Sequence, residues 1–71
     1  MIENSLNHTN RTHILKRHAG WAVKKEGAQK AVKVFSTKEE AIEAAEKFRK
    51  SGSDIVIHKK DGSIERWVKG I

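Results

Sequence analysis

The sequence predicts a small α+β domain, in which an antiparallel sheet with elements in the order β-β-β-α-β-β carries one helix on one face. Residues 32–48 change from an alternating apolar pattern to a capped helical pattern. The segments on both sides of them have the composition of short strands joined by turns. The 71 residues suffice for one domain with a single layer of core side chains between sheet and helix.

The N-terminal segment is expected to be a disordered tail over residues 1–11, because it is polar, rich in Asn and without hydrophobic period. The single domain then covers residues 12–71. Its first strand is predicted over residues 12–17, where Ile14 and Leu15 stand among polar neighbours.

A hairpin is expected to follow. Residues 21–25 alternate in polarity, with Trp21 and Val23 on one face of the strand. A short loop with Gly27 at a positive φ then leads into a third strand over residues 31–35. The short connection makes the two strands antiparallel neighbours.

The helix is predicted over residues 38–50. Thr37 is a favourable N-cap, and Glu40 follows at the spacing of a capping box. Gly52 is suited to the position just after the helix. One apolar face results from the spacing of Ala41, Ala44, Ala45 and Phe48, with Ile42 beside them.

The last two strands are predicted as a hairpin over residues 54–58 and 63–69, turning at Asp61-Gly62. A simple two-residue turn places Ile55 opposite Val68, Ile57 opposite Arg66 and Val56 opposite Trp67, whereas a bulge at Gly62 would shift this register. The expected core consists of Ile14, Trp21, Val23, Val32, Val34, Ala41, Ala45, Phe48, Ile55, Ile57 and Ile64.

Five segments stand in a characteristic order along the chain. They are Gly20-Trp21-Ala22-Val23-Lys24, Glu26-Gly27-Ala28, residues 37–45, Ile55-Val56-Ile57-His58 and Asp61-Gly62-Ser63-Ile64. Together they resemble a small bacterial family known as domain of unknown function 2188. The resemblance covers about residues 12–67 and implies a compact α+β domain of bacterial or phage origin, with no assigned activity. In its first strand, His13-Ile14-Leu15-Lys16 stands where such proteins usually show His-Val-Val-Pro.

A second, local similarity covers residues 21–48, which resemble the N-terminal arm-binding domains of tyrosine integrases. Those domains place a three-stranded sheet in the DNA major groove, with a helix behind it. The matching positions here are Phe35, Thr37, Lys38, Glu40 and Ala41. These positions mostly determine the junction between the strand and the helix, and the helix cap.

The excess positive charge lies outside the predicted helix, because the four acidic and four basic residues of 37–50 cancel within a net charge of +6. A basic excess on strands suggests a polyanionic partner, although small proteins also carry net charge for solubility. We therefore expect a basic binding module that could engage nucleic acid through its sheet face. The candidate binding residues are Lys16, Lys24, Lys33, Lys59, Arg66 and Trp67.

An alternative is a protein-interaction or accessory domain. The edges of a sheet of short strands can accept a strand from another protein or from a second copy of the chain. Lysines on strands would then protect the edges against aggregation.

The sequence gives no sign of an enzyme, a metal site or a cofactor, and no small-molecule substrate is expected. Glu39, Glu43 and Glu46 form a solvated stripe on the helix, and no nucleophile elbow or phosphate-binding loop is present. The histidines are expected to be surface or partly satisfied residues without a common metal. They are His8, His13, His18 and His58.

A cytoplasmic location without membrane contact is expected. The sequence has no cysteine, which fits a reducing compartment. It also has no apolar run of the ~18 residues that span a bilayer, and no secretory h-region near Met1.

Overall fold

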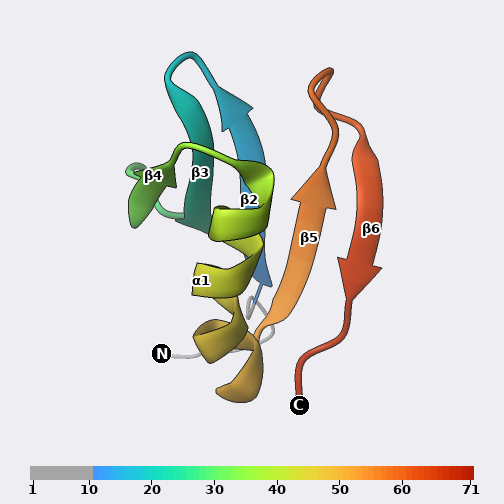
Figure 1. The fold of residues 1–71 in the computed structure, drawn as a ribbon. Coiled ribbons are helices and arrows are strands. Elements are labelled where there is room, and N and C mark those ends of the chain that lie inside the picture. Colours follow the sequence, from blue (N-terminus) through green and yellow to red (C-terminus); the bar gives the residue numbers. More distant parts are fainter. Residues whose placement is uncertain (1–10) are drawn as a thin grey trace.

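The strands and the helix follow one another in the predicted order in the computed structural model, which describes residues 11–71 (Figure 1). The elements are β2 (Arg11–Arg17), β3 (Gly20–Lys25), β4 (Lys33–Phe35), α1 (Lys38–Lys50), β5 (Asp54–His58) and β6 (Ile64–Val68). The α+β class and the order of elements are confirmed.

The predicted tail lies outside the described residues except for its last member. Arg11 is the first residue of β2 and pairs with Asp54 of β5, so the strand begins one residue earlier than expected. Within residues 11–71, no helix is both long enough and apolar enough to cross a membrane.

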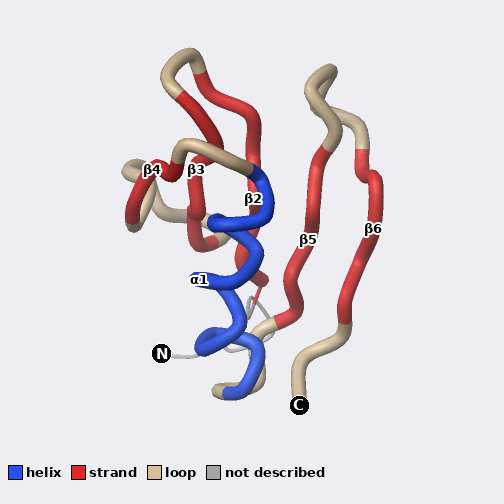
Figure 2. Tube along the Cα trace, viewed as in Figure 1, coloured by secondary structure: helices blue, strands red, loops and turns tan. Residues whose placement is uncertain are grey.

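The sheet has the strand order β4-β3-β2-β5-β6, and Figure 2 shows β2, β3 and β4 beside the β5–β6 hairpin, with α1 connecting the two parts. Neighbouring strands are antiparallel except β2 and β5, which are parallel, with Thr12 opposite Ile55 and Ile14 opposite Ile57. The prediction of a wholly antiparallel sheet is therefore wrong at this pair. A helical crossover returns the chain to the end of the sheet where the preceding strand began, which makes β5 parallel to β4 and hence to β2.

Local side-chain hydrogen bonds fix the start of α1. The Thr37 hydroxyl accepts a hydrogen bond from the Glu40 backbone N–H at 3.1 Å, and Glu40 Oε1 accepts one from the Thr37 N–H at 3.3 Å. This is the predicted capping box. Gly52 follows the helix at φ +105°, a conformation that favours glycine, so the predicted end of the helix is confirmed as well.

The core lies between α1 and one face of the sheet. Its buried members are Ile14, Trp21, Val23, Ala41, Ala45, Ile55 and Ile57, as predicted. Phe48, also predicted there, is partly buried at the margin of this cluster. The Thr12 side chain is fully buried beside them, and its hydroxyl lies 2.8 Å from that of Ser53.

Three predicted core residues are exposed instead, with 52% of Val32, 44% of Val34 and 51% of Ile64 accessible to solvent. Val32 precedes β4, which begins only at Lys33. Val34 pairs with Ala22 and points away from α1.

A β-bulge explains the position of Ile64. The predicted pairs of Ile55 with Val68, Val56 with Trp67 and Ile57 with Arg66 are confirmed. The register then shifts, and Ile64 pairs with His58. Glu65 is therefore the extra residue of β6, and Ile64 faces away from α1.

Gly20 allows the close approach of β3 and β4. Its φ is +152°, and a Cβ atom built on it would lie 2.1 Å from the Phe35 carbonyl oxygen. A larger residue at position 20 would push β3 and β4 apart at the point where Trp21 pairs with Phe35.

Two isoleucines of the second hairpin provide a matched test of the core. Ile57 is fully buried, so Ile57→Ala should lower the free energy of unfolding by about 2–5 kcal/mol. Ile64→Ala removes the same atoms from an exposed site and should change it by less than about 0.5 kcal/mol. Urea unfolding monitored by circular dichroism measures both values, and equal losses would contradict the assignment of the core.

Candidate functional surface

The two faces of the sheet differ in what covers them. The helix packs against β2, β3 and β5 on one face, seen in Figure 1, and contacts β4 at the edge. The opposite face, here called the open face, carries the side chains that alternate away from α1 and is covered by no element within residues 11–71. Its apolar members are Leu15, Ala22, Val34, Val56, Ile64 and Trp67.

These apolar residues form two rows across the strands. In one row Val34, Ala22 and Leu15 are successive partners on β4, β3 and β2. In the other, His13 of β2 is followed by Val56 and then Trp67. Val56 and Ala22 are fully buried, whereas 47% of Trp67 is exposed. The open face is therefore apolar at its centre and accessible toward both edges.

The structure divides the predicted binding residues between the two faces. Lys24 and Trp67 lie on the open face, because they share its rows with His13 and Val56. Lys59 lies in the turn after β5. The other three are on the α1 side, where Lys16 pairs with Trp21, Lys33 with Val23 and Arg66 with Ile57. The six residues do not form one surface.

Lysines on the α1 side cover aromatic rings at the margin of the core. Their ammonium nitrogens lie between 4.6 and 5.9 Å from a ring centroid, within the range of cation–π attraction. The pairs are Lys16 and Lys38 with Trp21, Lys25 and Lys47 with Phe48, and Lys33 with Phe35. Their aliphatic stems shield the rings from water, so part of the positive charge has a structural role.

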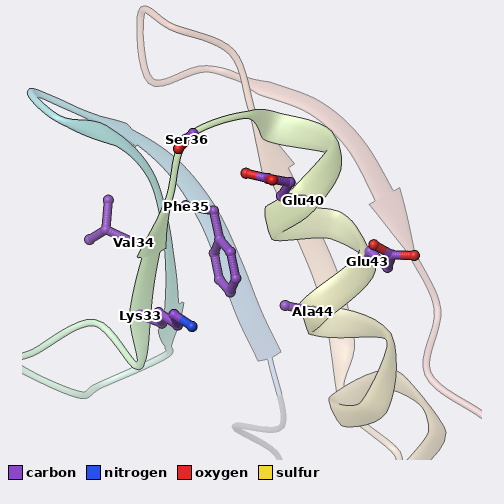
Figure 3. A pocket seen from close by; sticks show the side chains of 7 residues that line it. All are labelled: Lys33, Val34, Phe35, Ser36, Glu40, Glu43 and Ala44. Carbon is purple, nitrogen blue, oxygen red and sulfur yellow. The ribbon is translucent and has the colours of Figure 1, made fainter.

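A shallow groove runs between β4 and α1, shown in Figure 3. The Phe35 ring points into it, and Val34 points to the opposite side of β4. Lys33, Glu40 and Glu43 also line this groove. The two carboxylates make it unfavourable for an anionic ligand.

A chain of hydrogen bonds on the open face, here called the histidine chain, connects four residues that are far apart in the sequence. His13 Nδ1 lies 2.9 Å from His58 Nε2, and His13 Nε2 lies 2.7 Å from Glu26 Oε1. His58 Nδ1 lies 2.9 Å from the Gly62 carbonyl oxygen. The chain thus links the loop after β3 to the β5–β6 turn across two strands.

A second polar cluster lies beside the histidine chain. The Trp67 indole N–H donates to Asp54 Oδ2 at 2.9 Å, and the Gly70 N–H donates to Asp54 Oδ1 at 2.8 Å. The Arg11 guanidinium lies 5.1 Å from the centroid of the Trp67 ring and donates to Glu26 Oε2 at 3.1 Å. Arg11 therefore connects the two clusters.

Hydrogen bonds lower the pKa of both acidic groups. The His13 side chain, with Arg11 contributing, holds the pKa of Glu26 below its ordinary value despite partial desolvation. The Gly70 N–H and then the Trp67 indole lower the pKa of Asp54. Both carboxylates are consequently ionised at neutral pH.

The sequence does not predict the histidine chain, because it indicates only surface or partly satisfied histidines without a common metal. His13 and His58 are 45 residues apart, and only the parallel pairing of β2 with β5 brings them together. A signal was present, since His13, Glu26, His58 and Gly62 all stand in the segments that resemble the bacterial family. His8 lies outside the described residues, and 11–71 contain no cluster of three or more potential metal ligands.

Comparison with known proteins agrees with this resemblance. The model of a family described as uncharacterized protein conserved in bacteria (DUF2188) matches residues 12–66. The uncharacterized protein YdaT of Bacillus subtilis (strain 168) is 41% identical over 58 residues, which are 80% of this chain and 39% of YdaT. The chain thus spans about two fifths of that relative's length. No solved structure matches significantly.

The lowered pKa of Glu26 predicts a loss of stability in acid. The stabilisation is present above the ordinary carboxyl pKa of 4.5 and disappears as the pH falls through the lower value of the folded chain. Glu26→Gln should cost about 1 kcal/mol at neutral pH and make the acid limb of the stability curve shallower.

Glu43→Gln is the control, because that carboxylate lies exposed on α1 and makes none of the hydrogen bonds found within residues 11–71. Urea unfolding between about pH 3 and pH 7 measures the effect. Identical acid limbs for the wild type and Glu26→Gln would show that the bonds to His13 and Arg11 do not stabilise the fold.

Proposed function

The chain belongs to the DUF2188 family of uncharacterized proteins conserved in bacteria, and from the geometry of its open face we propose that it is a non-enzymatic module that binds an acidic protein. The observation that carries the proposal is the apolar surface that this face exposes toward its two edges. Val34 on β4 and Ile64 and Trp67 on β6 are exposed, and Ala22 and Val56 are buried between them. These five residues are here called the apolar patch. Exposed apolar surface with a polar rim is typical of protein–protein interfaces.

Charge favours an acidic partner over a second copy of the chain. Arg11, Arg17 and Lys24 lie on the same face as the apolar patch. The chain as a whole has a net charge of +6. Two copies meeting through this face would oppose like charges, whereas an acidic protein would be attracted to it and oriented on it.

The chemistry of the patch favours a protein over nucleic acid. Its centre is aliphatic, whereas single-stranded nucleic acid is held by aromatic platforms on which bases stack. Besides the histidines, Trp67 is the aromatic side chain on the described part of the open face. The Trp67 indole already donates its hydrogen bond to Asp54. Arg11 lies over the indole ring, which reduces the surface left for stacking.

A binding role also suits the histidine chain. The ring nitrogens of His13 and His58 are engaged with each other, with Glu26 and with the Gly62 carbonyl, so none is directed at a substrate. We place the module in the cytoplasm, which the absence of cysteine supports.

Site-specific photocrosslinking in the native bacterium tests the face that is used. A benzoylphenylalanine in place of Val34 or Ile64 should crosslink to an acidic protein, identified by mass spectrometry. The same group in place of Glu43, on the exposed side of α1, is the control and should give no such product. Products formed only at Glu43 would contradict the proposal. A nuclease-sensitive product would favour nucleic acid, and a crosslinked dimer would favour self-association.

The identified protein, once purified, then serves in a binding titration. Ile64→Asp places a negative charge within the apolar patch and should weaken binding about tenfold or more, because it opposes both the apolar contact and the acidic partner. Glu43→Gln should leave the dissociation constant within about twofold. Equal affinities for the wild type and Ile64→Asp would exclude the open face as the binding surface.

A further inference from the structure

We infer that the His13–His58 pair holds three ring protons rather than two, which places a positive charge on the open face. The histidine chain ends in an acceptor on both sides, the Glu26 carboxylate and the Gly62 carbonyl oxygen. This inference concerns the free chain. Its consequence for partner binding rests on the function proposed above.

The argument is a count of hydrogen-bond donors. The carboxylate of Glu26 accepts, so His13 Nε2 must carry a proton. The Gly62 carbonyl oxygen accepts, so His58 Nδ1 must carry another. The contact of 2.9 Å between the two rings needs a third proton, on His13 Nδ1 or on His58 Nε2. Two neutral imidazoles supply only two, so one ring of the pair is an imidazolium.

The charged groups around the pair are compatible with one additional proton. Glu26 is in direct contact with His13 and compensates the charge. The sheet and α1 separate the pair from the acidic stripe of the helix. The strand β6 offers the neutral side chains of Ile64 and Trp67. The remaining charged groups on the open face are Arg11 and Arg17 on β2, Lys24 on β3 and Asp54 on β5. Lys59, Lys60 and Asp61 lie in the turn after β5, and Lys69 follows β6 near Asp54.

Loss of the third proton would leave one of the three contacts without a hydrogen. The chain would then release the loop at Glu26, the turn at Gly62 or the contact between the rings. The third proton therefore lets all three contacts form together. The positive charge that it brings should strengthen the binding of an acidic partner to the open face.

Nitrogen NMR of the imidazole rings in the free, full chain counts the protons directly. At about pH 7.5, where an ordinary histidine is mostly neutral, we expect His13 and His58 together to show three protonated nitrogens. Two protonated nitrogens at that pH, one on each ring, would overturn the inference whatever the outcome of the crosslinking.

His58→Gln tests the assignment of the third proton. The amide NH2 of glutamine has two donors, for His13 Nδ1 and for the Gly62 oxygen, so the chain no longer needs an additional proton. In the same NMR spectrum, His13 of this variant should show one protonated nitrogen.

His18→Gln is the matched control, because His18 is exposed in the β2–β3 turn and lies outside the histidine chain. It should retain the three protonated nitrogens of the wild-type pair. A doubly protonated His13 in His58→Gln, or the loss of the third proton in His18→Gln, would contradict the assignment to the pair. If the proton count is three and no crosslink forms on the open face, the proposed function fails and the charged pair stands.

Discussion

β2 lies at the centre of the sheet, hydrogen-bonded to β3 on one side and, in parallel, to β5 on the other. This parallel pairing joins the antiparallel strands β4, β3 and β2 to the β5–β6 hairpin, because α1 is the only covalent connection between these two parts within residues 11–71. It places Ile14 beside Ile57 under the helix and His13 beside Val56 on the open face. The core and the histidine chain therefore depend on the same pairing, and any change that separates β2 from β5 removes both.

Local features of the fold could be predicted from the sequence, because neighbouring residues determine them. The capping box at Thr37 and the pairing of Val56 with Trp67 depend only on residues that are close together in the sequence. The parallel pairing of β2 with β5 could also be predicted. β3 already has partners on both sides, so β5 could join only at β2 or β4, and a helical crossover makes it parallel to either. The bulge at Glu65 was not predictable in this way, because its register depends on packing.

The candidate surface was harder to predict, because it depends on which face each side chain takes and on contacts between distant segments. Lys16, Lys33 and Arg66 were grouped by charge alone, and their strand partners turn all three toward the helix side. The contact of His13 with His58 arises across 45 residues. In the proposed function, charge favours an acidic partner, and the face that would bind it follows only from the three-dimensional arrangement.

The bulge in β6 also affects the self-association of this chain. As the outermost strand of its hairpin, β6 has an unpaired edge along which a foreign strand could dock and begin a fibril. The extra residue Glu65 breaks the regular spacing of that edge, and its carboxylate, paired with Lys38, adds charge there. Edge-to-edge association of domains through β6 is therefore disfavoured. The apolar residues of the open face can stay exposed without polymerisation through this edge strand.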